Sequence, residues 1–310
     1  MSFPRLRGTL PGLAHALSLG AVSWVFSEGV FWASWRDDEG LGGVALTWLA
    51  YSVVSYLALA AARRFAVGTW AGWFVVGALF GWLAEGALAG TVLVTAPQQI
   101  SWTGLAWHAP LTVCVGWVAL PAALRGSLVR AIAASAAVGA GFGLWAAGYV
   151  HEPDGDGVPT LGAFAVYATA LAALLGLAYA LCDRLGRSLP ERPGRVPVAL
   201  AGLALAGWYG LGVAPTSPLS VRLVLVLIAA PLLLLRRAPL AAPAPRPSAP
   251  RLRGSSLGAL LALPAMAVAT FAAFEPFAGE LPVYAAFLLL TPGGVVALAW
   301  SARRVRRLGP

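Results

Sequence analysis

The sequence predicts an all-α, polytopic integral membrane protein with about ten transmembrane helices and both termini in the cytoplasm. Three observations predict this fold class. Of the 310 residues, 59% are hydrophobic and only 11% are charged, whereas soluble domains carry about a quarter charged residues. The apolar residues come in runs of roughly 17–25, the length that a helix needs to cross the hydrocarbon of a bilayer. The arginines are concentrated in alternate loops.

Each apolar run is expected to be a helix, because a lipid-exposed backbone must satisfy its own hydrogen bonds. The alternating ten-residue segments of an outer-membrane barrel are not visible in the sequence. The first run continues through Trp24 to Trp35, which favours an uncleaved helix over a signal peptide. Odd-numbered spans run from the inside to the outside, and even-numbered spans run back to the arginine-rich loops on the inside. In order, the predicted spans are 12–34, 44–62, 69–94, 105–123, 129–149, 160–181, 196–213, 219–235, 256–273 and 282–301.

The basic residues support this topology. With the N-terminus inside, nineteen of the 21 basic residues lie on the inner side, and only Arg36 and Arg222 fall outside. Positive charge is retained on the cytoplasmic side of membrane proteins. The net charge of +9 therefore reports this topology and contact with anionic inner-leaflet lipids. It does not indicate a nucleic-acid partner. We expect a multi-pass protein of the bacterial cytoplasmic membrane, with both termini inside.

The chain is predicted to have three parts. Residues 1–235 form an eight-helix membrane domain with polar residues in its outer half. Residues 236–256 form a basic, Pro- and Ala-rich cytoplasmic linker, because this composition disfavours a packed core. Residues 257–310 form a two-helix membrane hairpin with a basic tail. Cys114 and Cys182 lie at different depths, so we expect no disulfide.

Glu85 is a carboxylate within span 69–94, where charge is costly unless it faces a cavity or a partner. Gly77 and Gly81 precede it by eight and four residues, so the three positions share one stripe of the helix. Small residues at this spacing let a second helix approach closely. We therefore expect Glu85 to face protein, without a fixed ion-pair partner, as a reversibly protonated acid. The alternative is a protonated side chain with a purely structural hydrogen bond.

Glu28 is the second carboxylate within a span, and Trp24 and Trp32 lie one helical turn away on its face. A carboxylate between indoles suits an organic cation, with about 0.5–2 kcal/mol of cation–π attraction per ring. The alternative is that these tryptophans belong to the aromatic belt at the membrane interface.

Residues 95–110 are predicted to form a re-entrant or interfacial segment, because they combine both glutamines with proline, glycine and two tryptophans. His108 follows about one turn below the outer surface, at a depth comparable to that of Glu28 and Glu85. These three residues are the predicted catalytic or proton-carrying groups, and two Glu and one His also suit a metal site. The predicted substrate-binding residues are Trp24, Trp32, Trp82, Trp102 and Trp107.

The nine residues Leu83–Thr91 resemble the glutamate-bearing first helix of small multidrug-resistance transporters. In that family the glutamate exchanges protons for cationic drugs. The resemblance implies proton exchange at Glu85.

Three functions are consistent with these features. The first is a proton-linked transporter of a small organic substrate, cationic or amphipathic, with Glu85 as the proton switch. The second is a membrane-embedded enzyme that acts on a lipid or isoprenoid at the outer leaflet, with Glu85 and His108 as acid–base or metal-binding residues. The third is a non-catalytic subunit of a larger complex. The sequence assigns no cofactor, metal or oligomeric state.

Overall fold

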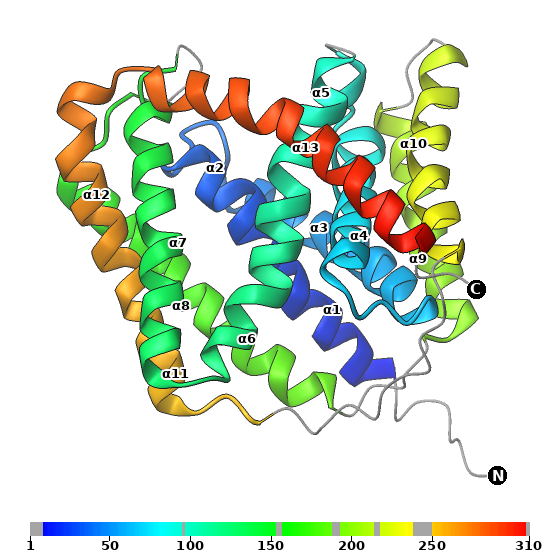
Figure 1. Cartoon of the computed structure of the whole chain (residues 1–310), viewed down its shortest axis with the longest axis horizontal. Helices are drawn as coiled ribbons and strands as arrows, with labels where there is room; N and C mark the ends of the chain where they lie inside the picture. Colours follow the sequence, from blue (N-terminus) through cyan, green and yellow to red (C-terminus); the bar gives the residue numbers. More distant parts are fainter. Residues whose placement is uncertain are drawn as a thin grey trace.

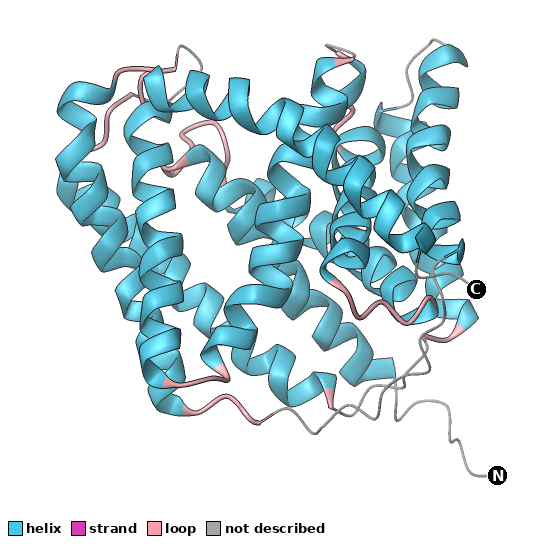
Figure 2. Ribbon diagram, viewed as in Figure 1, coloured by secondary structure: helices cyan, strands magenta, loops and turns pink. Residues whose placement is uncertain are grey.

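A computed structural model describes residues 9–94, 97–152, 157–187, 193–213, 218–237 and 250–307. Within these ranges the chain is helical and contains no β-strand (Figures 1 and 2). Ten helical runs are long and apolar enough to cross a membrane, and each overlaps one of the predicted spans. The all-helical class and the ten candidate spans are therefore confirmed for the described part of the chain. The runs are Leu10–Trp32, Leu41–Arg64, Trp70–Leu88, Gln98–Leu124, Leu128–Tyr149, Leu161–Gly186, Arg195–Val213, Pro218–Arg237, Gly254–Ala278 and Leu281–Arg307.

Several of these runs change helix type along their length. Four segments are π-helical, with wider turns than an α-helix, namely η1, η2, η4 and η5. In chain order the elements are α1 (Thr9–Trp24), η1 (Val25–Gly29), α2 (Val30–Trp32), α3 (Leu41–Arg64), α4 (Trp70–Trp82), η2 (Leu83–Leu88), η3 (Thr91–Leu93), α5 (Gln98–Ser101), η4 (Trp102–Ala119), α6 (Leu120–Leu124), α7 (Leu128–Tyr149), α8 (Leu161–Gly186), α9 (Arg195–Trp208), η5 (Tyr209–Val213), α10 (Pro218–Arg237), α11 (Gly254–Gly258), η6 (Ala259–Leu261), α12 (Ala262–Ala278) and α13 (Leu281–Arg307).

The longest π-helical segment, η4, contains Pro110. Proline has no amide hydrogen and its ring clashes with the preceding turn, so the regular α-helical bond cannot form there. Of the two alternatives predicted for residues 95–110, the re-entrant one is wrong for the described residues. From Gln98 onward they are a continuous helical extension of the fourth span, and only residues 95–96 lie outside the described part.

Glycines permit backbone contact between α7 and α12. A Cβ atom at Gly139 would collide with the carbonyl oxygen of Leu263, and one at Gly143 would collide with that of Ala267. Small residues four apart allow helices in membranes to approach this closely. The close contact fixes α12 along α7, as Figure 1 shows.

The last two helices separate after the turn that joins them. α12 packs against α7 and α8, whereas α13 runs obliquely across the molecule to contact η4 and α4 (Figure 1). A hydrogen bond from Ser101 Oγ to the Thr291 carbonyl, 2.5 Å long, connects α13 to the end of α5. Both helices of the predicted hairpin 257–310 therefore contribute to the same bundle as the first eight spans. Most of the predicted linker, residues 238–249, lies outside the described residues.

Candidate functional site

Three π-helical segments carry the three predicted proton-carrying residues. Glu28 lies on η1, Glu85 on η2 and His108 on η4, and η4 contacts both other segments. π-Helical turns are rare and are frequently found at functional sites, because the widened turn re-aims side chains and frees backbone groups. The three residues therefore share an unusual backbone conformation.

The glycine stripe of α4 brings η2 and η4 together, as the sequence predicts. A Cβ atom at Gly77 would lie 2.6 Å from Ala109 Cα, and one at Gly81 would lie 2.5 Å from the Gly104 carbonyl oxygen. Both separations are too short for a real Cβ, so only glycine permits this approach. The expectation that Glu85 faces protein is confirmed, since its exposed fraction is 9%.

Glu85 forms a direct hydrogen bond with His108. Glu85 Oε1 and His108 Nε2 are 2.7 Å apart, and His108 is 2% exposed. The other carboxylate oxygen, Oε2, accepts a hydrogen bond from the Thr91 hydroxyl. The expectation that Glu85 lacks a fixed partner is wrong, because the helix contact at Gly81 aligns the two side chains. A buried carboxyl group paired with an imidazole can hold one proton between them.

The second ring nitrogen of His108 contacts two hydroxyl groups. Ser27 Oγ lies 3.1 Å from His108 Nδ1, and Thr112 Oγ1 lies 3.4 Å from the same nitrogen. The two hydroxyls are 3.1 Å from each other, and both are buried. When Nε2–H donates to Glu85, the neutral ring accepts a proton at Nδ1, and these hydroxyls are positioned to donate it.

Glu28 lies beside this network and has its own partners. Its Oε1 accepts a hydrogen bond of 2.6 Å from the Tyr51 hydroxyl, and its Oε2 accepts one of 2.6 Å from the Trp32 indole. The Tyr51 ring also lies next to the His108 imidazole, with ring centroids 6.4 Å apart. Glu28 and the Glu85–His108 pair are therefore neighbouring groups, with Tyr51 bonded to the first and packed beside the second.

Trp24 and Trp32 line a small cavity at Glu28. Its volume is about 40 Å³, which is space for one or a few waters. The Arg36 guanidinium lies 4.0 Å from the centre of the Trp32 ring, so the chain's own cation covers that indole. Arg36 also pairs with Asp38, and its hydrogen bond lowers the pKa of the exposed Asp38 carboxyl. An organic cation at Trp32 would have to displace Arg36.

The other three predicted substrate-binding tryptophans are buried in protein contacts. The Trp82 indole donates a 2.9 Å hydrogen bond to the Ile100 carbonyl, and Trp107 donates one of 3.0 Å to the Phe26 carbonyl. Trp102 packs against the aromatic rings of Trp145 and Phe287. In this structure these indoles hold the helices of the site in place.

Aromatic donors recur at the π-helical segments. In a π-turn a carbonyl accepts from the amide five residues on, and each carbonyl oxygen has a second lone pair that can accept another hydrogen bond. Tyr and Trp side chains from other helices donate to four of these carbonyls at distances of 2.7–3.0 Å. The pairs are Trp107 with Phe26, Tyr167 with Gly29, Trp208 with Leu88 and Tyr179 with Gly116.

Several residues of the site are absent from the sequence-based prediction. Thr112 follows His108 by four residues, so helical spacing places both on one face and is a signal that could have found it. Tyr51 and Thr91 have no such signal, because their positions depend on the packing of separate elements. Among the described residues, no three His, Cys, Asp or Glu side chains gather closely enough to hold a metal ion, so Glu28, Glu85 and His108 do not form the three-ligand set that the sequence allows.

Comparisons with protein families, with curated proteins and with solved structures gave no match.

Proposed function

We propose that this protein is a proton-linked membrane transporter of a small, amphipathic organic substrate, with Glu85 and His108 as its proton-carrying pair. One observation carries the proposal. A buried acid–base pair, with a second carboxylate beside it across Tyr51, lies inside a bundle of apolar helices. Ionisable residues at such positions mark proton relays and substrate paths in membrane proteins.

The packing at the site supports movement of the proton pair. α4, which leads directly into η2, touches η4 through glycine backbone at Gly81 and Gly104. Smooth contacts of this kind let helices slide or rock, which alternating access requires. The occupied face of Trp32 favours an amphipathic substrate over a compact organic cation at Glu28.

The experiment is a proton-flux assay in proteoliposomes that contain a pH-sensitive dye. A panel of amphipathic compounds is added one at a time under an imposed pH gradient. At least one compound is expected to drive proton movement in the wild-type protein. The Glu85→Gln variant is expected to lower that movement by about tenfold or more, because glutamine cannot carry the proton.

Asp37→Asn is the matched control, since Asp37 is an exposed acid in the loop before α3. This variant is expected to retain the wild-type flux. Proton movement that persists in Glu85→Gln, or its absence for every compound in the panel, contradicts the transport proposal.

A second candidate function is favoured by the alignment of Ser27, His108 and Glu85. A hydroxyl, an imidazole and a carboxylate in a row are the groups of a serine nucleophile, its base and the acid that orients the base. In the familiar triads the hydroxyl contacts Nε2 and the acid contacts Nδ1. Here the two contacts are exchanged. The corresponding activity is acyl transfer on a lipid.

A fluorophosphonate probe tests this alternative. In an enzyme, Ser27 Oγ attacks phosphorus, fluoride leaves, and His108 takes the hydroxyl proton. Labelling of the wild-type protein that is lost in Ser27→Ala and kept in Ser23→Ala would favour the enzyme. Ser23 is a suitable control because it is also buried and bonds to Ser55 at 2.8 Å. We expect no labelling, as the transport proposal requires.

A further inference from the structure

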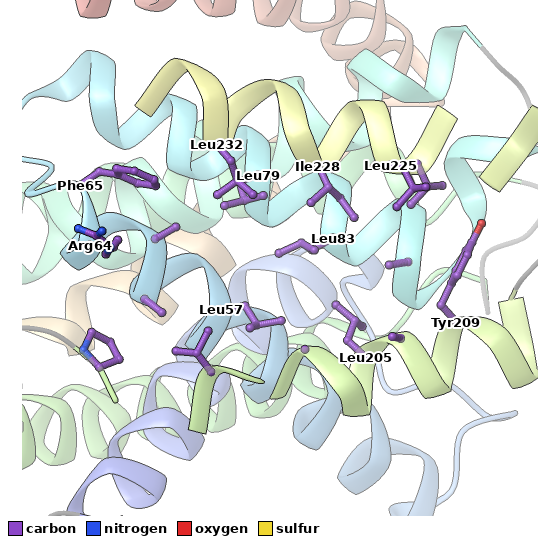
Figure 3. A pocket seen from close by; sticks show the side chains of 18 of the residues that line it. Leu57, Arg64, Phe65, Leu79, Leu83, Leu205, Tyr209, Leu225, Ile228 and Leu232 are labelled. Atoms are coloured by element: carbon purple, nitrogen blue, oxygen red, sulfur yellow. The ribbon is translucent and has the colours of Figure 1, made fainter. Parts of the chain in front are cut away.

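A long apolar groove lies between four membrane helices, on the side of η2 away from His108. Its volume is about 570 Å³, within the range of small-molecule and lipid sites. Figure 3 shows it between α3, α4, α9 and α10, with Leu57, Leu79, Leu205 and Ile228 pointing into it. Nearly all of the residues that line it are apolar. They include Leu57, Ala60, Ala61, Leu79, Leu83, Ala87, Val198, Leu205, Ala206, Leu225, Ile228 and Leu232.

The groove is long and apolar. Along α9 it extends from Arg195 to Tyr209, a helical rise of about 21 Å. A hydrocarbon chain matches this length and the apolar lining. Gly202 is at its centre, where a Cβ atom would meet nothing within 4 Å.

Positive charge is confined to one end. Arg64 closes α3 and lines the groove at the end opposite Tyr209 (Figure 3). Arg195, which also lines the groove, opens α9, whereas Tyr209 follows the last residue of that helix, so Arg195 too is at the end away from Tyr209. Both side chains are exposed, and within the described ranges neither has an ion-pair partner. Under the predicted topology this end faces the cytoplasm. An apolar channel that ends in two free guanidinium groups is complementary to a hydrocarbon chain with an anionic head group.

We propose that this groove binds one anionic phospholipid of the inner leaflet, with its phosphate between Arg64 and Arg195 and a hydrocarbon chain along α9. This binding site does not depend on the transport activity. Its wall includes Leu83 and Ala87, which flank Glu85 on η2. Trp208 of α9 donates a 2.9 Å hydrogen bond to the Leu88 carbonyl at the end of η2. The lipid therefore packs against the segment that positions the proton pair.

The binding site for the hydrocarbon chain of the lipid is tested by filling the groove with a bulky side chain. The purified full-length protein is mixed in detergent with phosphatidylglycerol or phosphatidylcholine, and bound lipid is counted by native mass spectrometry. The wild-type protein is expected to retain one phosphatidylglycerol. Gly202→Trp places an indole in the groove and is expected to lower this binding by about tenfold or more. Gly207→Trp is the control, because Gly207 lies on the same helix, outside the groove, with open space around it.

The head-group site is tested by removing its charge. The Arg64→Gln/Arg195→Gln double variant is expected to lose the preference for phosphatidylglycerol over phosphatidylcholine, a loss of about tenfold for two phosphate contacts. Arg130→Gln/Arg253→Gln removes two exposed arginines that do not line the groove, and is expected to keep the preference. Wild-type binding by Gly202→Trp overturns the proposal, as does an unchanged preference in the Arg64→Gln/Arg195→Gln variant. Competition by free inorganic phosphate alone would show that the groove takes no lipid chain.

Discussion

Replacing His108 by leucine is expected to lower the free energy of unfolding by about 3 kcal/mol, a large share of the 5–15 kcal/mol that stabilises a typical protein. The reason is that Glu85 would remain buried beside Thr91 without the imidazole that now lies 2.7 Å from it. An acid left without its partner must either keep an uncompensated charge or take up a proton and lose its hydrogen bond. Denaturation of the purified protein in detergent micelles, followed by circular dichroism, measures the change.

The double variant Glu85→Leu/His108→Leu is the decisive comparison. Removing both partners leaves neither group unsatisfied, so the double variant is expected to be more stable than His108→Leu alone. His108→Gln, which keeps a side chain able to hydrogen-bond, is expected to lose less than His108→Leu. The Glu85→Leu and His108→Leu single variants complete the comparison. If their losses of unfolding free energy add up to that of the double variant within about 0.5 kcal/mol, the two side chains are not coupled, which contradicts the geometry.

The second large effect is expected from a single methyl group at Gly81. A Cβ atom there would lie 2.5 Å from the Gly104 carbonyl oxygen, so Gly81→Ala must push α4 away from η4. Overpacking of this kind costs about 1–3 kcal/mol, and it also lengthens the bond between Glu85 and His108. Gly81→Ala is therefore expected to lower the thermal midpoint and to impair proton flux as much as Glu85→Gln does.

Gly86→Ala provides the matched control on the neighbouring segment. A Cβ atom at Gly86 would make ordinary contacts of 3.5 Å with Val224 and Val92. This variant adds the same methyl group without forcing helices apart, so its midpoint and flux are expected to stay near those of the wild type. Equal behaviour of the two alanine variants would contradict the assignment of Gly81 to a critical helix contact.

The number and approximate bounds of the helices could be predicted from the sequence, because long apolar runs in a lipid environment permit only one backbone conformation. The packing of the Glu85 side of the helix against protein could also be predicted, since Gly77 and Gly81 lie on the same stripe of the helix as Glu85. The direct bond to His108 could not. Its direction depends on the π-helical turns of η2 and η4, and hydrophobic periodicity carries no signal for a single widened turn.

The tryptophans illustrate a second limit of the sequence. A tryptophan near a membrane carboxylate gives the same sequence pattern whether its indole contacts a substrate, lies at the membrane interface or bonds to a backbone carbonyl. Trp32 bonds to Glu28 itself, whereas Trp82 and Trp107 each bond to a carbonyl of a different element. The pairings of Trp82 and Trp107 join residues 18 and 81 positions apart, in separate elements, so only the packed structure specifies them.

The aromatic donors on the π-helical carbonyls also have a consequence for register. A helix advances by about 100° per residue, so each turn that closed from π to α geometry would rotate every later side chain by roughly that angle. Tyr167 on Gly29 and Tyr179 on Gly116 oppose such closure, because each occupies a carbonyl that the regular helix would reclaim. The two tyrosines thereby stabilise the π-helical turns, and so fix the direction in which the later side chains of each helix point.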